Sequence, residues 1–170
     1  PAGTGMMVCL HACNTATDLA LAQAVRAQVP IIFAVPCCQH ELYAQLKTRK
    51  ETFRTDDHLL FPFMEHGIIS ERFASLLTDT VRALLLQACG YSVQIMEFIE
   101  TEHTPKNILI HAVKKPQSAD QAERLKATAF RQYRRLKDSF CIEPTLEERL
   151  EPVLEPFLKE LLPTKEKETL

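Results

Sequence analysis

The sequence predicts an α/β fold, and three observations lead to this expectation. Residues 6–10 and 31–35 are continuous apolar runs, which are typical of buried parallel strands, and a helical pattern separates them. A strand–helix–strand unit of this length forms a right-handed crossover, which makes its two strands parallel. Residues 91–99 and 106–113 also have strand character, and the short turn between them indicates an antiparallel pair.

The helices are predicted from apolar spacing and from end signals. Thr15 and Asp18 are three residues apart, as in a capping box that opens a helix. Ser70 is the expected cap of a long helix, and Gly90 lies where a helix commonly stops. The segment 56–67 contains a proline, a glycine and several aromatic residues, so we expect a loop there.

The C-terminal third is predicted to be helical and is polarised in charge. Ser118 should begin a helix, and residues 118–140 hold six Lys and Arg against three acids, whereas residues 141–170 hold four bases against eight acids. Four prolines within residues 143–163 predict short, broken helices. We therefore expect a sheet domain over 1–116 and a helical extension over 117–170.

The composition is that of an ordinary globular protein. Hydrophobic residues make up 46% of the 170, and the net charge of -2 gives no overall attraction to nucleic acid or to an anionic membrane. No apolar run is long enough to span a bilayer, so no membrane partner is expected. Six cysteines in a chain of this kind predict reduced thiols and a cytoplasmic location rather than a secreted, disulfide-linked domain.

The first predicted strand leaves a sheet edge without a neighbour in the predicted order of elements. A bare apolar edge promotes aggregation, so natural proteins cover it. The expected partner is the N-terminal half of the same domain, or a second copy of the chain.

Polar and sulfur-containing residues follow both predicted parallel strands, at the position where open α/β sheets bind ligands. After the first strand come His11, Ala12, Cys13, Asn14, Thr17 and Asp18. After the second come Pro36, Cys37, Cys38 and His40. The turn before the last strand adds Lys106 and Asn107, for which a solvated turn is the simpler interpretation.

The cysteines could also serve as metal ligands or as reactive thiols, and the basic helix could contact nucleic acid. The spacing contains no C-x-x-C pair, and adjacent cysteines rarely chelate one tetrahedral ion, so no metal is expected. Cys37 or Cys38 beside His40 would suit a cysteine nucleophile or a redox thiol. The basic helix over 118–140 is either solvated surface or one edge of an RNA groove.

Four motifs in this order, LHACNTATD, VPCCQHEL, LLTDTVRALLLQACGY and EHTPKNILI, resemble those of bacterial methyltransferase-like proteins of class I, which depend on S-adenosylmethionine. The first motif is also similar to one in eukaryotic tRNA ribose methyltransferases that act on the acceptor stem. The resemblance covers residues 6–113. Asn14 departs from it mildly, because the relatives often have Gly or Asp there.

The resemblance implies that the chain is the C-terminal half of a Rossmann-like methyltransferase sheet, with parallel strands and an antiparallel final strand. The Gly-rich loop that holds most of the cofactor has no counterpart here, so the chain alone should bind S-adenosylmethionine weakly or not at all. His11 and His40 are the implied catalytic bases, and RNA is the favoured acceptor. The implied cofactor contacts are His11, Ala12, Cys13, Asn14, Thr17 and Asp18, and the implied acceptor contacts are Pro36, Cys37, Cys38, His40, Lys106 and Asn107.

The alternative is a non-catalytic module that keeps the methyltransferase fold as a platform for protein or RNA binding.

Overall fold

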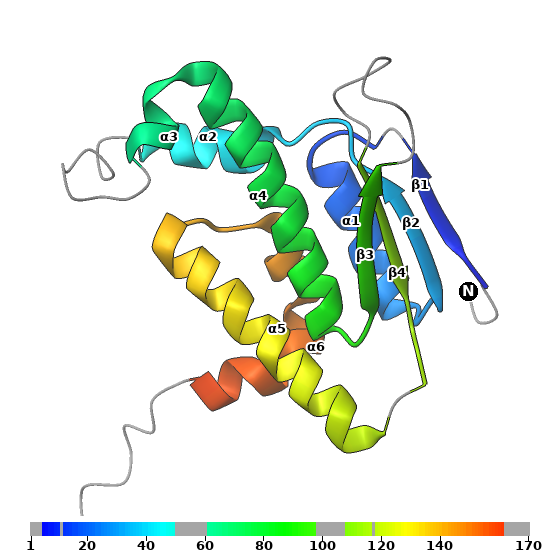
Figure 1. Ribbon diagram of the computed structural model, residues 1–170. Coiled ribbons are helices and arrows are strands. Elements are labelled where there is room, and N and C mark those ends of the chain that lie inside the picture. Colours follow the sequence, from blue (N-terminus) through cyan, green and yellow to red (C-terminus); the bar gives the residue numbers. More distant parts are fainter. Residues whose placement is uncertain (1–4, 11, 50–60, 98–107, 117, 162–170) are drawn as a thin grey trace, which may run out of the picture.

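The computed structural model describes residues 5–10, 12–49, 61–97, 108–116 and 118–161, with side chains as far as residue 157 (Figure 1). Within these residues the strands are β1 (Met7–Leu10), β2 (Ile31–Val35), β3 (Ser92–Glu97) and β4 (Ile108–Val113). The helices are α1 (Thr15–Arg26), α2 (His40–Thr48), α3 (Phe61–Glu65), α4 (Gly67–Ala88), α5 (Ala119–Phe140) and α6 (Thr145–Leu161). The chain is thus a mixed α/β protein, as predicted.

The four strands form one mixed sheet in the order β1-β2-β4-β3. β1 and β2 are parallel, with Cys9 opposite Ala34, whereas β4 is antiparallel to both β2 and β3. The predicted parallel unit and the predicted antiparallel pair are both confirmed. The carboxyl ends of β1, β2 and β3 therefore meet at one edge of the sheet, where β4 begins.

The described helices bury one face of the sheet and leave the other largely open. Cys9, Ala34 and Ile110 lie in one register row and are buried, in a core that α1 and α4 share with the strands. On the opposite face Val8 and Leu10 are 52% and 56% exposed. β1 lies at the outer edge of the sheet (Figure 1). Parallel strands are normally covered on both faces. The exposure of Val8 and Leu10 therefore leaves apolar side chains on the open face of the sheet that a covering element would normally bury.

α1 begins at Thr15 as predicted, but the capping interactions predicted for α1 and α4 are not formed. Asp18 does not form a capping box with Thr15, because its side chain turns inward to a partner on α4. α4 begins at Gly67, so Ser70 lies within its first turn, where it is buried and contacts Met64. α3 occupies part of the segment that was expected to be a loop.

Two predicted helix-end signals, the Ser118 cap and the Gly90 stop, are confirmed. Ser118 caps α5 by accepting a hydrogen bond from the backbone N–H of Gln121 at 3.4 Å. Gly90 follows the end of α4 with a φ of 89°, a conformation that glycine adopts without strain.

The prediction of short, broken helices after residue 143 is also wrong, because α6 is one helix with Pro152 and Pro156 inside it. Both prolines lie on its exposed side, where water can satisfy the backbone carbonyls that lose their usual partners. Leu146, Leu150 and Leu154 form its buried stripe. Burial of this stripe outweighs the local preference of proline.

Basic residues of α5 form ion pairs with acidic residues of the segment that follows it. Lys137 on α5 pairs with Glu143 at 2.7 Å and also with Glu147, and Arg134 pairs with Glu147 at 3.8 Å. A single core cluster includes residues of the sheet, of α1 and of α6. No helix among the described residues has the length and apolar character needed to cross a membrane.

Candidate functional site

Two loops at the carboxyl ends of β1 and β2 lie side by side and are hydrogen-bonded together. We call residues 12–14 and 36–39 the strand-end loops. The Asn14 backbone N–H donates to the Cys38 carbonyl at 3.2 Å, and the Glu41 N–H donates to Asn14 Oδ1 at 2.9 Å. The side chain of Asn14 therefore caps α2, the helix that follows the second loop. This contact fixes the loops relative to each other.

Asn14 has an unusual backbone conformation, with φ 51° and ψ -126°. Positive φ favours glycine, and a ψ of -126° lies outside the left-handed helical region that asparagine tolerates, so this conformation is strained for asparagine. Its side-chain hydrogen bond to α2 gives asparagine a stabilising contact that glycine could not make. The departure from Gly at this position is therefore compatible with the fold.

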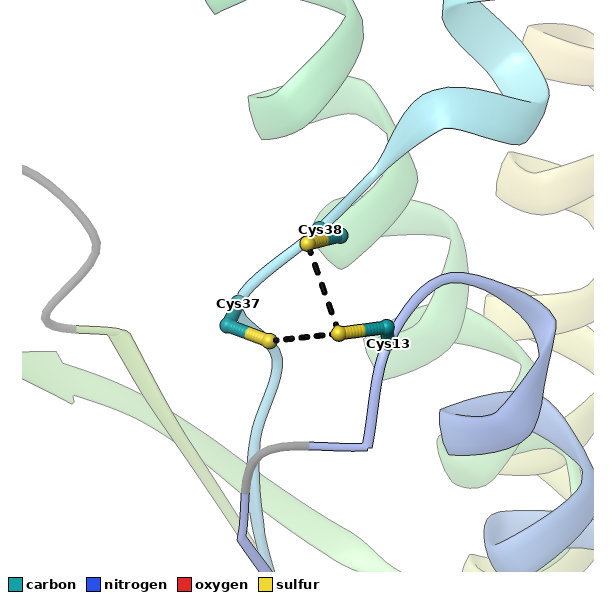
Figure 2. Close-up of side chains that lie close together, drawn as sticks. All are labelled: Cys13, Cys37 and Cys38. Carbon is teal, nitrogen blue, oxygen red and sulfur yellow. Dashed lines mark hydrogen bonds between the residues drawn. The ribbon is translucent and has the colours of Figure 1, made fainter.

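The strand-end loops bring three thiols together (Figure 2). Cys13 Sγ lies 3.4 Å from Cys37 Sγ and 3.6 Å from Cys38 Sγ, and all three sulfur atoms lie within 4.8 Å of one another. Hydrogen bonding to Cys37, with a smaller effect from Cys38, raises the pKa of the Cys13 thiol to about 11. Cys13 is therefore protonated at neutral pH. None of the six cysteines forms a disulfide.

A buried ion network anchors the first loop to α4. Arg82, only 1% exposed, donates through Nε and Nη2 to the two carboxylate oxygens of Asp18 at 2.8 and 2.9 Å. Its Nη1 donates to Asp79 Oδ1 at 3.0 Å, and Nη2 also donates to the Asn14 carbonyl at 3.1 Å. The guanidinium thus joins α1, α4 and the loop after β1. Removing it would leave two carboxylates buried without a counter-charge.

The network contains two carboxylates and one guanidinium, and this imbalance affects the pKa values of its members. Burial opposes the charge of Arg82, but its hydrogen bonds to Asp18 outweigh that cost and its pKa lies above the ordinary value. Burial raises the pKa of Asp79 to about 6, against the attraction of Arg82. Gln39 of the second loop donates Nε2 to Asp79 Oδ2 at 3.0 Å, whereas its Oε1 is buried without a partner. A protonated Asp79 could donate to that oxygen if the amide rotated by half a turn.

Asp79→Asn is expected to flatten the dependence of stability on pH. With its pKa at about 6 in the fold and near 3.8 when exposed, Asp79 retains a proton that the unfolded chain has lost. Its contribution to stability is therefore complete below about pH 4 and is lost by about pH 6, a fall of about 2–3 kcal/mol. Urea denaturation of wild type and variant across this range measures the difference. Asp120→Asn, on an exposed turn, is the control; parallel curves for wild type and Asp79→Asn would contradict the assignment.

Of the other predicted site residues, some are buried or bonded to the backbone, one is exposed, and the rest lie outside the described residues. The Thr17 hydroxyl donates to the Ala12 carbonyl at 2.6 Å, and Pro36 is buried. His40 begins α2 with an exposed side chain, and no described residue forms a hydrogen bond with its imidazole, so no Cys–His pair is formed there. His11, Lys106 and Asn107 lie outside the described residues.

Sequence reasoning missed Arg82, Asp79 and Gln39. The signal was present in the long apolar helix, where Asp79 and Arg82 fall among the buried positions of α4, such as Val81 and Leu85. A charged pair on the apolar side of a helix indicates a partner on another element, because an isolated charge is seldom buried.

Comparison with known proteins places a methyltransferase-domain family model on residues 1–45. These residues include β1, α1, β2 and both strand-end loops. Two proteins named "Glutathione S-transferase C-terminal domain-containing protein", from Homo sapiens and Macaca fascicularis, are each 29% identical over 133 residues. The match covers 65% of this chain, and the chain spans about a fifth of the length of these curated relatives. No solved structure matches.

Proposed function

We propose that this chain is part of an S-adenosylmethionine-dependent methyltransferase and that the strand-end loops line the methyl-transfer site. The observation that carries the proposal is that the methyltransferase-domain match falls on the segment containing both loops. The geometry supports it, because the loops lie where open α/β sheets bind ligands, and their backbones are held by Asn14. Positioning dominates catalysis of an in-line methyl transfer, so rigid loops suit this chemistry.

The open sheet face supports the proposal that a Rossmann-like domain is completed by polypeptide beyond the described residues. Met6, Val8 and Leu10 lie on that face at about half exposure. Phe33 and His111 stack on it with ring centroids 4.5 Å apart. We propose that further chain of the same protein, or a second copy, covers this surface and supplies the remaining cofactor contacts. The 170 residues alone would then bind S-adenosylmethionine weakly.

RNA is the acceptor that we favour, in a cytoplasmic protein with reduced thiols. On the basic helix α5, three exposed residues on one side would provide the contact with RNA: Arg124, Arg131 and Arg135. These three arginines form no ion pair with a described residue, whereas Arg134 and Lys137 are paired with acids. A surface this small would support contact with RNA but not tight binding by itself.

His40→Ala in the full-length gene product is expected to reduce methyl transfer by about 100-fold or more, while the affinity for S-adenosylmethionine changes little. The reason is that His40 has an exposed imidazole beside the strand-end loops, without a hydrogen bond to any described residue, and a general base contributes on this scale. Transfer of a radiolabelled methyl group to total RNA and to total protein measures turnover and distinguishes the acceptors. Isothermal titration with S-adenosylmethionine measures affinity.

His66→Ala is the matched control, because His66 is an exposed histidine at the start of α4 and should not affect either measurement. Unchanged turnover in His40→Ala would remove His40 from the chemistry. No binding of S-adenosylmethionine by the full-length protein would contradict the proposed activity and favour the non-catalytic module.

A further inference from the structure

The three thiols of the strand-end loops have the arrangement of a metal site. Cys13 comes from the loop after β1, whereas Cys37 and Cys38 come from the loop after β2, so the ligands converge from two elements (Figure 2). The expectation of no metal came from the absence of a C-x-x-C pair and from the adjacency of Cys37 and Cys38 in the chain. In the fold, Cys13 lies beside the adjacent pair although 24 residues separate it from Cys37.

The distances between the sulfur atoms match those around a single ion. A tetrahedral zinc ion with Zn–S bonds of about 2.3 Å holds its sulfur ligands about 3.8 Å apart. The two separations from Cys13 Sγ, 3.4 Å to Cys37 and 3.6 Å to Cys38, are within a few tenths of an ångström of that value, and the Cys37–Cys38 separation is no more than 4.8 Å. Small side-chain rotations would therefore place all three sulfur atoms on one ion.

The chemistry of the donor set selects a soft metal. All three ligands are thiols, and no carboxylate or imidazole of the described residues joins the group. Sulfur ligands favour Zn²⁺ and Cu⁺ over Mg²⁺ or Ca²⁺, which prefer oxygen. The hydrogen bonds between the loops, from Asn14 to Cys38 and from Glu41 to Asn14, hold the sulfur atoms near one another without an ion.

We propose that Cys13, Cys37 and Cys38 bind one Zn²⁺ ion as three thiolates, with water as the fourth ligand. Each thiol releases its proton to solvent as its Zn–S bond forms, so three protons leave for each ion bound. Cys13 is exposed and the other two are partly exposed, which allows water to reach the open position. Three protein ligands with one exchangeable position is the arrangement of zinc sites that act on a bound molecule. The bound ion would also link the two loops.

Titration of the 170-residue chain with Co²⁺ and then Zn²⁺, under a non-thiol reductant, tests the site. We expect one equivalent of Co²⁺ to produce a thiolate-to-cobalt charge-transfer band, which Zn²⁺ then removes. Cys13→Ser, Cys37→Ser and Cys38→Ser should each weaken zinc binding by about 100-fold or more, since even residues that only orient a metal ligand contribute up to that much. Cys141→Ser replaces an exposed thiol at the C-cap of α5 and should bind like the wild type.

Thiol alkylation of the wild-type chain gives a test that does not depend on the folding of a variant. Zinc should slow labelling of Cys13, Cys37 and Cys38, as mapped by mass spectrometry, and leave labelling of Cys141 unchanged. Absence of the charge-transfer band, or zinc protection that omits Cys13, would overturn the proposal. These measurements use no S-adenosylmethionine, so their outcome is independent of the proposed methyl transfer.

Discussion

Arg82→Met should lower the free energy of unfolding by about 3–5 kcal/mol, which is the cost of removing one partner from a buried ion pair. Methionine fills similar space but leaves Asp18 and Asp79, each 2% exposed, with no counter-charge. The loop after β1 also loses the hydrogen bond from Arg82 to the Asn14 carbonyl. Urea denaturation at pH 7 followed by circular dichroism measures the loss.

Two variants separate the ion network from a general effect of losing an arginine. Arg72→Met removes an exposed arginine from the same helix and should change stability by less than about 0.5 kcal/mol. Adding Asp18→Asn and Asp79→Asn to Arg82→Met should recover part of the loss, because the uncompensated charges are gone. Equal stability of Arg82→Met and wild type would mean that the guanidinium does not neutralise these carboxylates.

Leu150→Ala is expected to destabilise the whole fold, by about 2–5 kcal/mol. Leu150 is fully buried on α6, which packs against α1, and α1 in turn covers β1 and β2. A cavity at this position should therefore weaken the sheet as well as the last helix. Hydrogen exchange followed by mass spectrometry measures both, and we expect faster exchange in β2 and in α6.

Leu125→Ala provides the comparison for this prediction, since Leu125 is 50% exposed on α5 and its truncation leaves no cavity. Its effect should stay below about 0.5 kcal/mol. If Leu150→Ala accelerated exchange in α5 and α6 alone, the helical extension over 117–170 would be an independent unit, as the predicted domain boundary supposes.

The strands could be predicted because burial dictates their composition. Parallel strands are usually apolar on both faces, and β1 and β2 show this as short unbroken runs, although the described helices cover only one face. α6 could not be predicted, because its prolines are a strong local signal, whereas the contacts that override them come from α1, far away in the chain. The capping box predicted at the start of α1 failed for a similar reason, since the partner of Asp18 lies 64 residues away.

The candidate site was predictable in its place but not in its contacts. The rule that ligands bind at the carboxyl ends of parallel strands located both strand-end loops from the order of elements. It could not show that Cys13 faces Cys37 and Cys38, because their separation depends on how the two loops turn. The role of Asn14 as a cap for α2 depends on the same geometry, which the sequence around Asn14 does not encode by itself.

Photo-crosslinking of S-adenosylmethionine, radiolabelled in its methyl group, to the full-length gene product tests most directly whether the strand-end loops line a methyl-transfer site. After irradiation, proteolysis and mass spectrometry, the label should map to peptides that contain residues 12–18 or 36–40, and excess unlabelled S-adenosylhomocysteine should abolish it. Label that is displaced by the competitor but maps only to other segments would contradict the account.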